Sequence, residues 1–256
     1  MITYCRARAM AAAVLATLIM PLPLLAQTPR QPIPLPTLCQ VPDEFLADSS
    51  PLANSTRQLR TERRLKIVAL GSSSTLGMGA SGPDAAYPAR LEAALKAHLP
   101  FAAIQVVNKG MSRQSARQML DRLTSDVLSE RPALVVWETG TAEAVRGAEV
   151  DDLVSALLTG VDKMGEAGID VLLMDTQYSR STARIINFQP YVDAIGQVAG
   201  MRDLVLFPRY LVMRTWVDED RFSFTDKPTA EARKIADQIY DCLGRLLART
   251  IAKALK

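Results

Sequence analysis

The chain has 256 residues, 48% of them hydrophobic and 22% charged, which is enough to build one domain with a large core. Its 30 basic and 27 acidic side chains give a formal net charge of +3, and the lysines and arginines form no long run. This balance lacks the basic footprint of a nucleic-acid-binding protein, so we expect no nucleic-acid partner.

The first 26 residues have the layout of a secretory signal peptide. Two arginines precede a short apolar run that ends in prolines and an alanine: Arg6, Arg8, Ala9–Met20, Pro21, Pro23 and Ala26. This order predicts export to the periplasm or the cell exterior, with cleavage after Ala26. Because Leu24 stands where a small residue is preferred, an uncleaved membrane anchor is the alternative. We expect contact with a membrane only through such an uncleaved segment.

Residues 27–64 lead into the domain. Four prolines predict an extended linker up to Leu38, and the polar stretch Cys39–Arg64 is expected to lie on the surface of a domain spanning residues 65–256. In an exported chain, Cys39 and Cys242 are candidates for a disulfide, although two buried thiols remain the alternative.

From Lys66 onward, apolar runs alternate with helical stretches. The expected strands are Lys66–Leu70, Ala103–Val107, Ala133–Trp137, Val171–Met174 and Leu204–Phe207. The expected helices are Ala85–His98, Gln114–Glu130, Val150–Ala167, Phe188–Ala199 and Pro228–Leu255. Such alternation predicts a three-layer α/β/α sandwich around a parallel sheet of about five strands. The loops that follow the strands then converge at one edge of the sheet.

The first strand ends in Gly71-Ser72-Ser73-Ser74-Thr75 and is followed by a helical pattern. A phosphate-binding loop is disfavoured, because the Gly-Lys-Ser/Thr ending is missing. Two interpretations stay open, a purely structural turn and a serine nucleophile at Ser73.

Three further loops extend the pattern. They read Asn108-Lys109-Gly110-Met111-Ser112-Arg113-Gln114, Glu138-Thr139-Gly140-Thr141-Ala142-Glu143 and Asp220-Arg221-Phe222-Ser223-Phe224-Thr225-Asp226. In order and spacing, these blocks resemble the SGNH (GDSL-type) hydrolase family over nearly the whole mature chain, and small exported bacterial members above all. The resemblance implies a flavodoxin-like fold and an esterase-like activity on acyl esters of lipids, carbohydrates or small alcohols.

The same resemblance assigns roles to individual positions. The nucleophile falls on Ser73 and the triad carboxylate on Asp220, whereas three family residues are replaced. The oxyanion glycine is replaced by Arg113, the oxyanion asparagine by Ala142 and the histidine base by Ser223. Since a serine hydroxyl is a poor nucleophile without a base, this pattern predicts impaired catalysis. The Arg113 guanidinium is expected to reach into the site, where it could hold an anion.

Several other residues are candidates for the site. Glu143 is a weak alternative base, and Gly140, Thr141, Gln177 and Tyr178 are expected around a pocket. His98 is the single histidine of the chain, but it ends a helix that carries it roughly 20 Å towards the opposite sheet edge. We therefore expect His98 to face away from Ser73.

These observations support three hypotheses. The first is an inactive SGNH-like protein that binds a small-molecule, acyl or carbohydrate ligand, or a partner, in the cell envelope. The alternatives are an active serine ester hydrolase that uses Ser73 with a non-standard base, and a structural envelope protein. No metal-ligand cluster and no nucleotide fingerprint occurs in the sequence, so we expect no metal or other cofactor.

Overall fold

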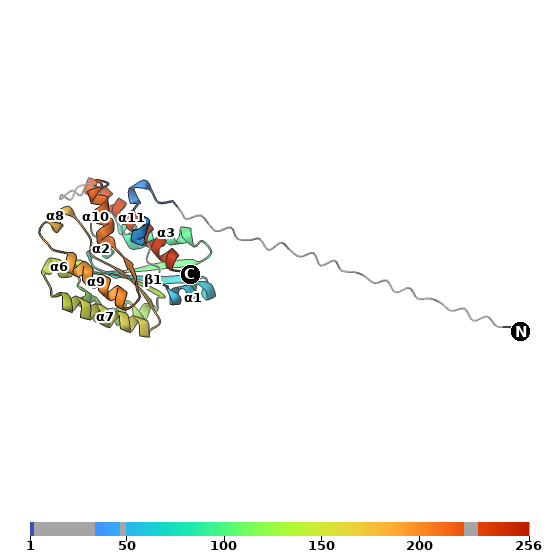
Figure 1. The fold of residues 1–256 in the computed structure, drawn as a ribbon. Coiled ribbons are helices and arrows are strands. Elements are labelled where there is room, and N and C mark those ends of the chain that lie inside the picture. Colours follow the sequence, from blue (N-terminus) through green and yellow to red (C-terminus); the bar gives the residue numbers. More distant parts are fainter. Residues whose placement is uncertain (3–33, 47–49, 223–229, 256) are drawn as a thin grey trace. The chain divides into compact units, whose positions relative to one another are not determined.

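The computed structural model describes residues 1–2, 34–46, 50–222 and 230–255 (Figure 1). The chain divides into two units, Met1–Pro32 and Ile33–Lys256, and the second unit carries the fold. The predicted signal peptide lies almost entirely outside the described residues. Within the described part of the chain, every helix is too short or too polar to cross a bilayer.

Five parallel strands form one sheet in the order β2-β1-β3-β4-β5. They are β1 (Arg64–Gly71), β2 (Ala103–Gly110), β3 (Leu134–Glu138), β4 (Asp170–Met174) and β5 (Val205–Phe207). Every neighbouring pair is parallel, which confirms the predicted sheet. From β1, the chain adds β2 on one side and β3, β4 and β5 on the other. The connections after β1 and β3 therefore run to opposite sides, and a crevice forms between the carboxyl ends of these two strands. Ligands bind in this crevice in such folds.

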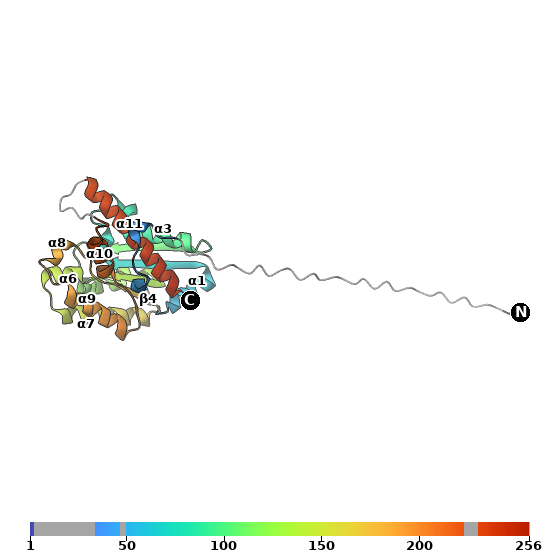
Figure 2. The same ribbon diagram turned by 45° about the horizontal axis from the view of Figure 1, so that its top comes forward.

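Helices cover both faces of the sheet and complete the predicted three-layer sandwich (Figures 1 and 2). One core cluster joins the sheet to α3 (Tyr87–His98), α10 (Arg209–Asp218) and α11 (Ala230–Ala254). The other joins it to α4 (Ala116–Asp121), α7 (Val150–Glu166) and α9 (Gln189–Met201). Short helices fill the loops: α1 (Ala53–Glu62), α2 (Ser73–Leu76), α5 (Leu123–Asp126), α6 (Thr141–Arg146) and α8 (Arg180–Ala183).

One helix expected from the sequence is broken. The stretch 114–130 forms α4, α5 and a 3-10 turn, because Arg122 between them leaves helical geometry with φ −105° and ψ 10°. Its guanidinium donates to the Gly71 carbonyl and to Asp126, so tertiary contacts at the end of β1 override local helix propensity. Conversely, α10 was not expected, and Trp216 on this helix is fully buried.

The lead-in segment contributes to the core instead of lying on the surface. Cys39, Leu46 and Leu52 are each 2% exposed and belong to the cluster beneath α11. The predicted Cys39–Cys242 disulfide is confirmed and links this segment to α11 across a separation of 203 residues. The Asp170 carboxylate accepts hydrogen bonds from the backbone N–H groups of Asn54 and Ser55, which fixes the start of α1.

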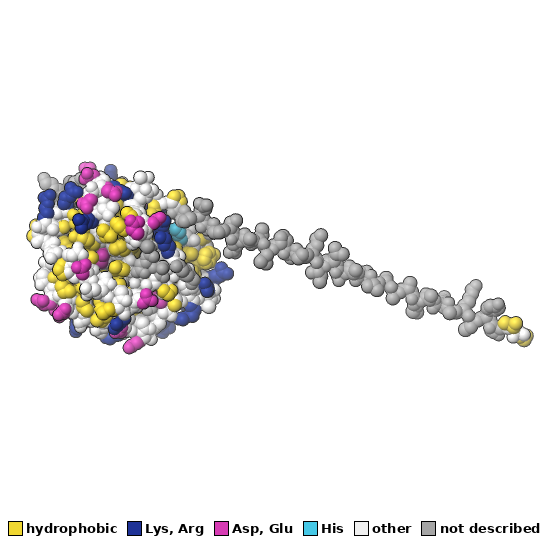
Figure 3. All heavy atoms as spheres, viewed as in Figure 1, with side chains coloured by type: hydrophobic (Ala, Val, Ile, Leu, Met, Phe, Trp, Pro, Cys, Tyr) yellow, Lys and Arg dark blue, Asp and Glu magenta, His cyan; other side chains and the backbone are white. Residues whose placement is uncertain are grey.

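Lysine and arginine side chains are interspersed with acidic and hydrophobic ones on the face drawn in Figure 3. This distribution agrees with the nearly balanced formal charge of the sequence.

Candidate active site

Ser73 lies where β1 gives way to α2. The strand ends at Gly71, Ser72 precedes the helix, and Ser73 is its first residue. In the sheet register, Gly71 pairs with Gly110 of β2, and Leu70 pairs with Trp137 of β3. The loops after β1, β2 and β3 therefore meet around Ser73 at the carboxyl edge of the sheet.

Two glycines allow this close approach. A Cβ atom on Gly71 would lie 2.0 Å from Thr75 Oγ1, and one on Gly110 would lie 2.1 Å from the backbone nitrogen of Leu76. Both distances are far below van der Waals contact, and the second clashes with main chain. The turn that presents Ser73 therefore depends on the absence of side chains at the ends of β1 and β2.

Glu138, the last residue of β3, lies fully buried beneath this turn. Its carboxylate accepts hydrogen bonds from the Ser72 backbone N–H at 2.8 Å, and from the Ser72 and Thr75 hydroxyls at 2.9 and 3.0 Å. Arg209, at the start of α10, donates to Glu138 at 3.0 Å and to the Ser74 hydroxyl at 2.7 Å. We call this buried ion pair, in which neither side chain is exposed, the Glu138–Arg209 junction.

Burial works against the charged form of Glu138, but the Arg209 charge and the Ser72 and Thr75 hydrogen bonds outweigh it and lower its pKa. The junction thus holds a full charge pair and links the loops after β1, β3 and β5. It fixes the backbone of the Ser73 turn from below.

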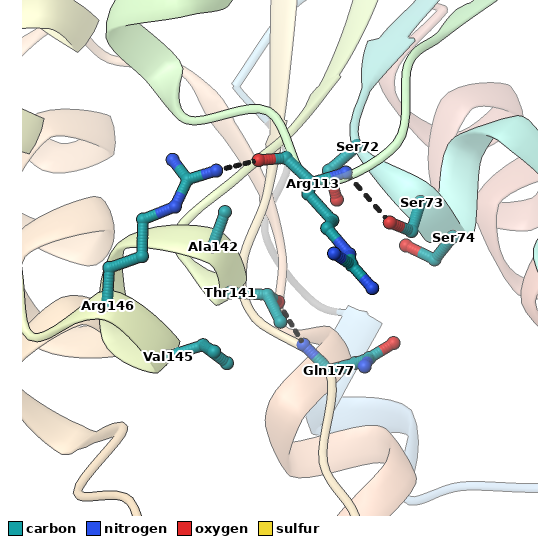
Figure 4. A pocket seen from close by; sticks show the side chains of 9 residues that line it. All are labelled: Ser72, Ser73, Ser74, Arg113, Thr141, Ala142, Val145, Arg146 and Gln177. Atoms are coloured by element: carbon teal, nitrogen blue, oxygen red, sulfur yellow. Dashed lines mark hydrogen bonds between the residues drawn. The ribbon is translucent and has the colours of Figure 1, made fainter.

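A cavity of about 250 Å³ opens above the junction (Figure 4). Serines from the β1 loop, residues of α6 and single residues from the β2 and β4 loops surround it: Ser72, Ser73, Ser74, Arg113, Thr141, Ala142, Val145, Arg146 and Gln177. Among the residues that the structure describes, this lining contains two arginines and no carboxylate.

The Ser73 hydroxyl faces neutral partners. Its oxygen accepts a hydrogen bond from the Arg113 backbone N–H at 2.9 Å and lies 3.2 Å from the Ser112 hydroxyl oxygen. Within the described part of the chain, no carboxylate and no imidazole makes a hydrogen bond to Ser73. The group placed to share its proton is therefore another alcohol, which is too weak a base to activate a nucleophile.

Arg113 adopts the left-handed conformation that glycine prefers, with φ +60°. Its backbone N–H remains directed at Ser73 although the side chain is large. Arg146 of α6 donates to the Arg113 carbonyl oxygen and so holds this conformation from the other side. The Arg113 side chain extends into the space between Ser73 and Gln177 (Figure 4).

The structure brings several expected pocket residues together. Ala142, Thr141 and Gln177 line the cavity, and the Thr141 hydroxyl accepts a hydrogen bond from the Gln177 backbone N–H at 3.2 Å. Gly140 precedes α6 with φ +89° and does not line the cavity. Tyr178 points elsewhere, because its ring packs edge-on against Tyr210 at 5.2 Å.

The acids expected near Ser73 lie away from the cavity. Glu143 is buried on the opposite side of α6 and accepts a hydrogen bond from the Ala116 backbone N–H, while burial raises its pKa. Asp220 lies in the exposed turn after α10, a helix that extends about 15 Å from Arg209. It does not line the cavity. Ser223 lies outside the described residues.

His98 ends α3 and lines a separate small cavity with Arg245 and Arg249. Partial burial, together with the Arg249 charge, lowers its pKa. The expectation that His98 faces away from Ser73 agrees with this placement.

Six residues of the site were given no role by the sequence reasoning: Ser74, Ser112, Glu138, Val145, Arg146 and Arg209. A usable signal existed for the junction, because Glu138 ends the buried strand β3, and Arg209, of opposite charge, lies two residues after the end of β5 at the same sheet edge. Asp175, which follows β4, was also missed. Burial raises the pKa of Asp175 to about 7, although the hydrogen bond that its carboxylate accepts from the Tyr210 backbone N–H acts to lower this pKa.

The parallel sheet in 2-1-3-4-5 order is that of a flavodoxin-like α/β protein, and the serine at its first turn stands where SGNH hydrolases carry one. The sequence model of the Non-GDSL lipase-like family matches residues 38–256, so the chain belongs to that family. No curated protein is similar enough in sequence to count as a relative.

Solved structures agree with this assignment. A lipase/acylhydrolase from Enterococcus faecalis is 25% identical, with 73% of this chain and 95% of that chain covered and a TM-score of 0.59. A catalytic mutant of Axe2, an acetylxylan esterase from Geobacillus stearothermophilus, is 19% identical, with 73% and 94% covered and a TM-score of 0.59. The second likeness concerns the fold alone.

Proposed function

We propose that this chain is an exported SGNH/GDSL-type protein that uses its hydrolase-like cavity to bind a ligand or partner in the cell envelope, with little or no ester hydrolysis. The observation that carries the proposal is the surroundings of Ser73, whose oxygen contacts only the Ser112 hydroxyl and the Arg113 N–H among the described residues. Loss of the base from a serine triad typically lowers turnover by about 10⁴ to 10⁶.

The retained scaffold supports a binding role over a purely structural one. The Glu138–Arg209 junction still shapes the Ser73 turn, and the cavity above it stays open. The similar structure at 25% identity is described as a lipase/acylhydrolase, which supports an acyl ligand for the cavity of this chain. A carbohydrate ligand stays a prediction from the family resemblance. Ala142 further supports weak catalysis, because it supplies no side-chain donor to an oxyanion.

Export is part of the proposal. The signal-like residues 1–26 favour it, and the Cys39–Cys242 disulfide supports an oxidising compartment such as the periplasm.

The test is covalent labelling of Ser73. The oxidised protein is incubated with a fluorophosphonate probe beside its Ser73→Ala variant and an active serine esterase, and p-nitrophenyl acetate turnover is measured in parallel. We expect no labelling and no turnover above the Ser73→Ala background. Labelling that disappears in Ser73→Ala would instead assign an active serine ester hydrolase with Ser73 as nucleophile.

A further inference from the structure

The cavity beside Ser73 has an uneven charge. Arg113 and Arg146 are its charged lining residues, and no acidic side chain joins them among the residues that the structure describes. Three buried acids at this edge of the sheet have other partners: Glu138 is paired with Arg209, Glu143 accepts from the Ala116 N–H, and Asp175 accepts from the Tyr210 N–H. Within the described residues, the positive charge on the cavity wall therefore has no carboxylate beside it to balance it.

The two arginines differ in their contacts. The Arg146 guanidinium donates to the Arg113 carbonyl and to Gln118, so it is used to hold the loop. Among the described residues, the Arg113 guanidinium makes no hydrogen bond or ion pair, and its side chain extends into the cavity (Figure 4). Its donors are thus free to meet a ligand.

The backbone of Arg113 has an unusual conformation. Glycine adopts φ +60° without steric cost, whereas a residue with a Cβ atom is destabilised in this left-handed region. An arginine at such a position is therefore disfavoured by local conformation, as it also is at Arg63 and Arg131. Arg113 differs from these two arginines in that it lines the cavity beside Ser73.

We propose that the Ser73 cavity binds the anionic head group, a carboxylate or a phosphate, of a small organic molecule, with the Arg113 guanidinium as its counter-ion. The proposal deepens the ligand-binding function given above and rests on it. The planar guanidinium fork matches two oxygens of either group. The Ser112 and Ser73 hydroxyls, which are close to the Arg113 backbone, can donate to the same oxyanion.

We expect the rest of the ligand to be apolar, because Val145 lines the cavity and is 59% exposed. Leu76 and Met111 lie outside the cavity lining, on the segments that carry Ser73 and Arg113, and are 46% and 47% exposed. A volume of about 250 Å³ equals the share of about eight water molecules, which is room for a head group and a few carbons. The ligand is therefore a short amphiphile or the anionic end of a longer one.

The experiment compares three probes by calorimetric titration of the oxidised full chain: hexanoate, hexyl phosphate and uncharged methyl hexanoate. We expect at least one anion to bind and methyl hexanoate to bind about tenfold more weakly or not at all. Tighter binding of hexanoate identifies a carboxylate ligand, and tighter binding of hexyl phosphate identifies a phosphate ligand. Added salt should weaken the binding of both anions.

Two matched variants locate the contact. Arg113→Gly keeps the backbone N–H and suits the left-handed conformation, and we expect it to bind the anion about tenfold or more weakly. Arg131→Gly makes the same change at φ +48° outside the cavity lining, and it should bind like the parent protein. Arg113→Lys keeps the positive charge but lacks the planar guanidinium group. Its affinity for the anion should lie between those of the parent protein and Arg113→Gly.

Unchanged anion affinity in Arg113→Gly would overturn the proposal. So would equal binding of methyl hexanoate, or failure of both anions to bind with a Kd below about 1 mM. Fluorophosphonate labelling tells failure of the anion site from failure of the proposed function. If Ser73 is labelled and anion binding depends on Arg113, the non-catalytic role is wrong and the anion site stands. If Ser73 is not labelled and no anion binds, the anion site is wrong and the non-catalytic role stands.

Discussion

Two regions only a few residues apart contrast sharply. Below the Ser73 turn, the Glu138–Arg209 junction is buried, and the oxygens of Glu138 have hydrogen-bond donors. Above the turn, Ser73 faces an exposed loop in which Ser112 and Arg113 are its hydrogen-bond partners. Positioning of a hydroxyl and activation of that hydroxyl are therefore separate properties. The lower region provides the first, and among the described residues the upper region offers Ser73 no carboxylate or imidazole that would provide the second.

The largest loss of stability should come from disrupting the Glu138–Arg209 junction below the Ser73 turn. Glu138→Gln removes the negative charge and leaves the buried Arg209 guanidinium unpaired, which should cost about 3 to 5 kcal/mol in the free energy of unfolding. Urea unfolding measures this change. The matched control is Asp162→Asn, which breaks an exposed ion pair with Arg202 and should change stability much less. Equal effects of the two substitutions would contradict the structural role of the junction.

Removal of the disulfide should cause the second-largest loss of stability and should leave anion binding in the Ser73 cavity unchanged. The double variant Cys39→Ala and Cys242→Ala frees the lead-in segment from α11, with an expected cost of about 2 to 5 kcal/mol. The disulfide does not line the Ser73 cavity, so anion affinity should match that of the parent protein under conditions in which both are folded. A variant that stays folded but loses affinity would show that the cavity depends on the lead-in segment.

Asp175 provides a pH-dependent comparison. Burial raises its pKa to about 7 from 3.8, so the folded protein keeps a proton that the unfolded chain has lost. The contribution of Asp175 to the free energy of unfolding is therefore at its full value below pH about 4. This contribution is lost as the pH rises from about 4 to about 7. Asp175→Asn should therefore gain stability relative to the parent protein over that range, as measured by urea unfolding at several pH values. Exposed Asp193→Asn is the control, and parallel curves for Asp175→Asn and the parent protein would contradict the expectation.

The smallest effect concerns the upper region. Arg113→Gly relieves the left-handed strain at φ +60° and should stabilise the protein by about 0.5 to 1 kcal/mol. Thermal unfolding measures the gain, and Arg131→Gly at φ +48° should show a similar one. A loss of stability specific to Arg113→Gly would mean that the guanidinium supports the fold and is not reserved for a ligand.

Local sequence patterns were enough to place most of the sheet. The first four strands each contain four or five apolar residues and β5 contains three, and the expected β3 and β4 ended within one residue of the observed strands. The single helix expected over 114–130 is interrupted at Arg122, whose guanidinium donates to the distant Gly71 carbonyl at the end of β1. The segment before β1 was expected on the surface for a related reason, since its few apolar residues are buried by elements distant in the sequence, α10 and α11 among them.

The sequence by itself determined the α/β order of elements and the serine at the first turn, because each depends on residues close together in the chain. Only the tertiary structure decided that Glu138 and Arg209 pair beneath that turn and that Arg113 faces a cavity whose described lining holds no carboxylate. The physical reason is distance along the chain: Glu138 and Arg209 are 71 residues apart, and the packing of five parallel strands brings their loops to one edge.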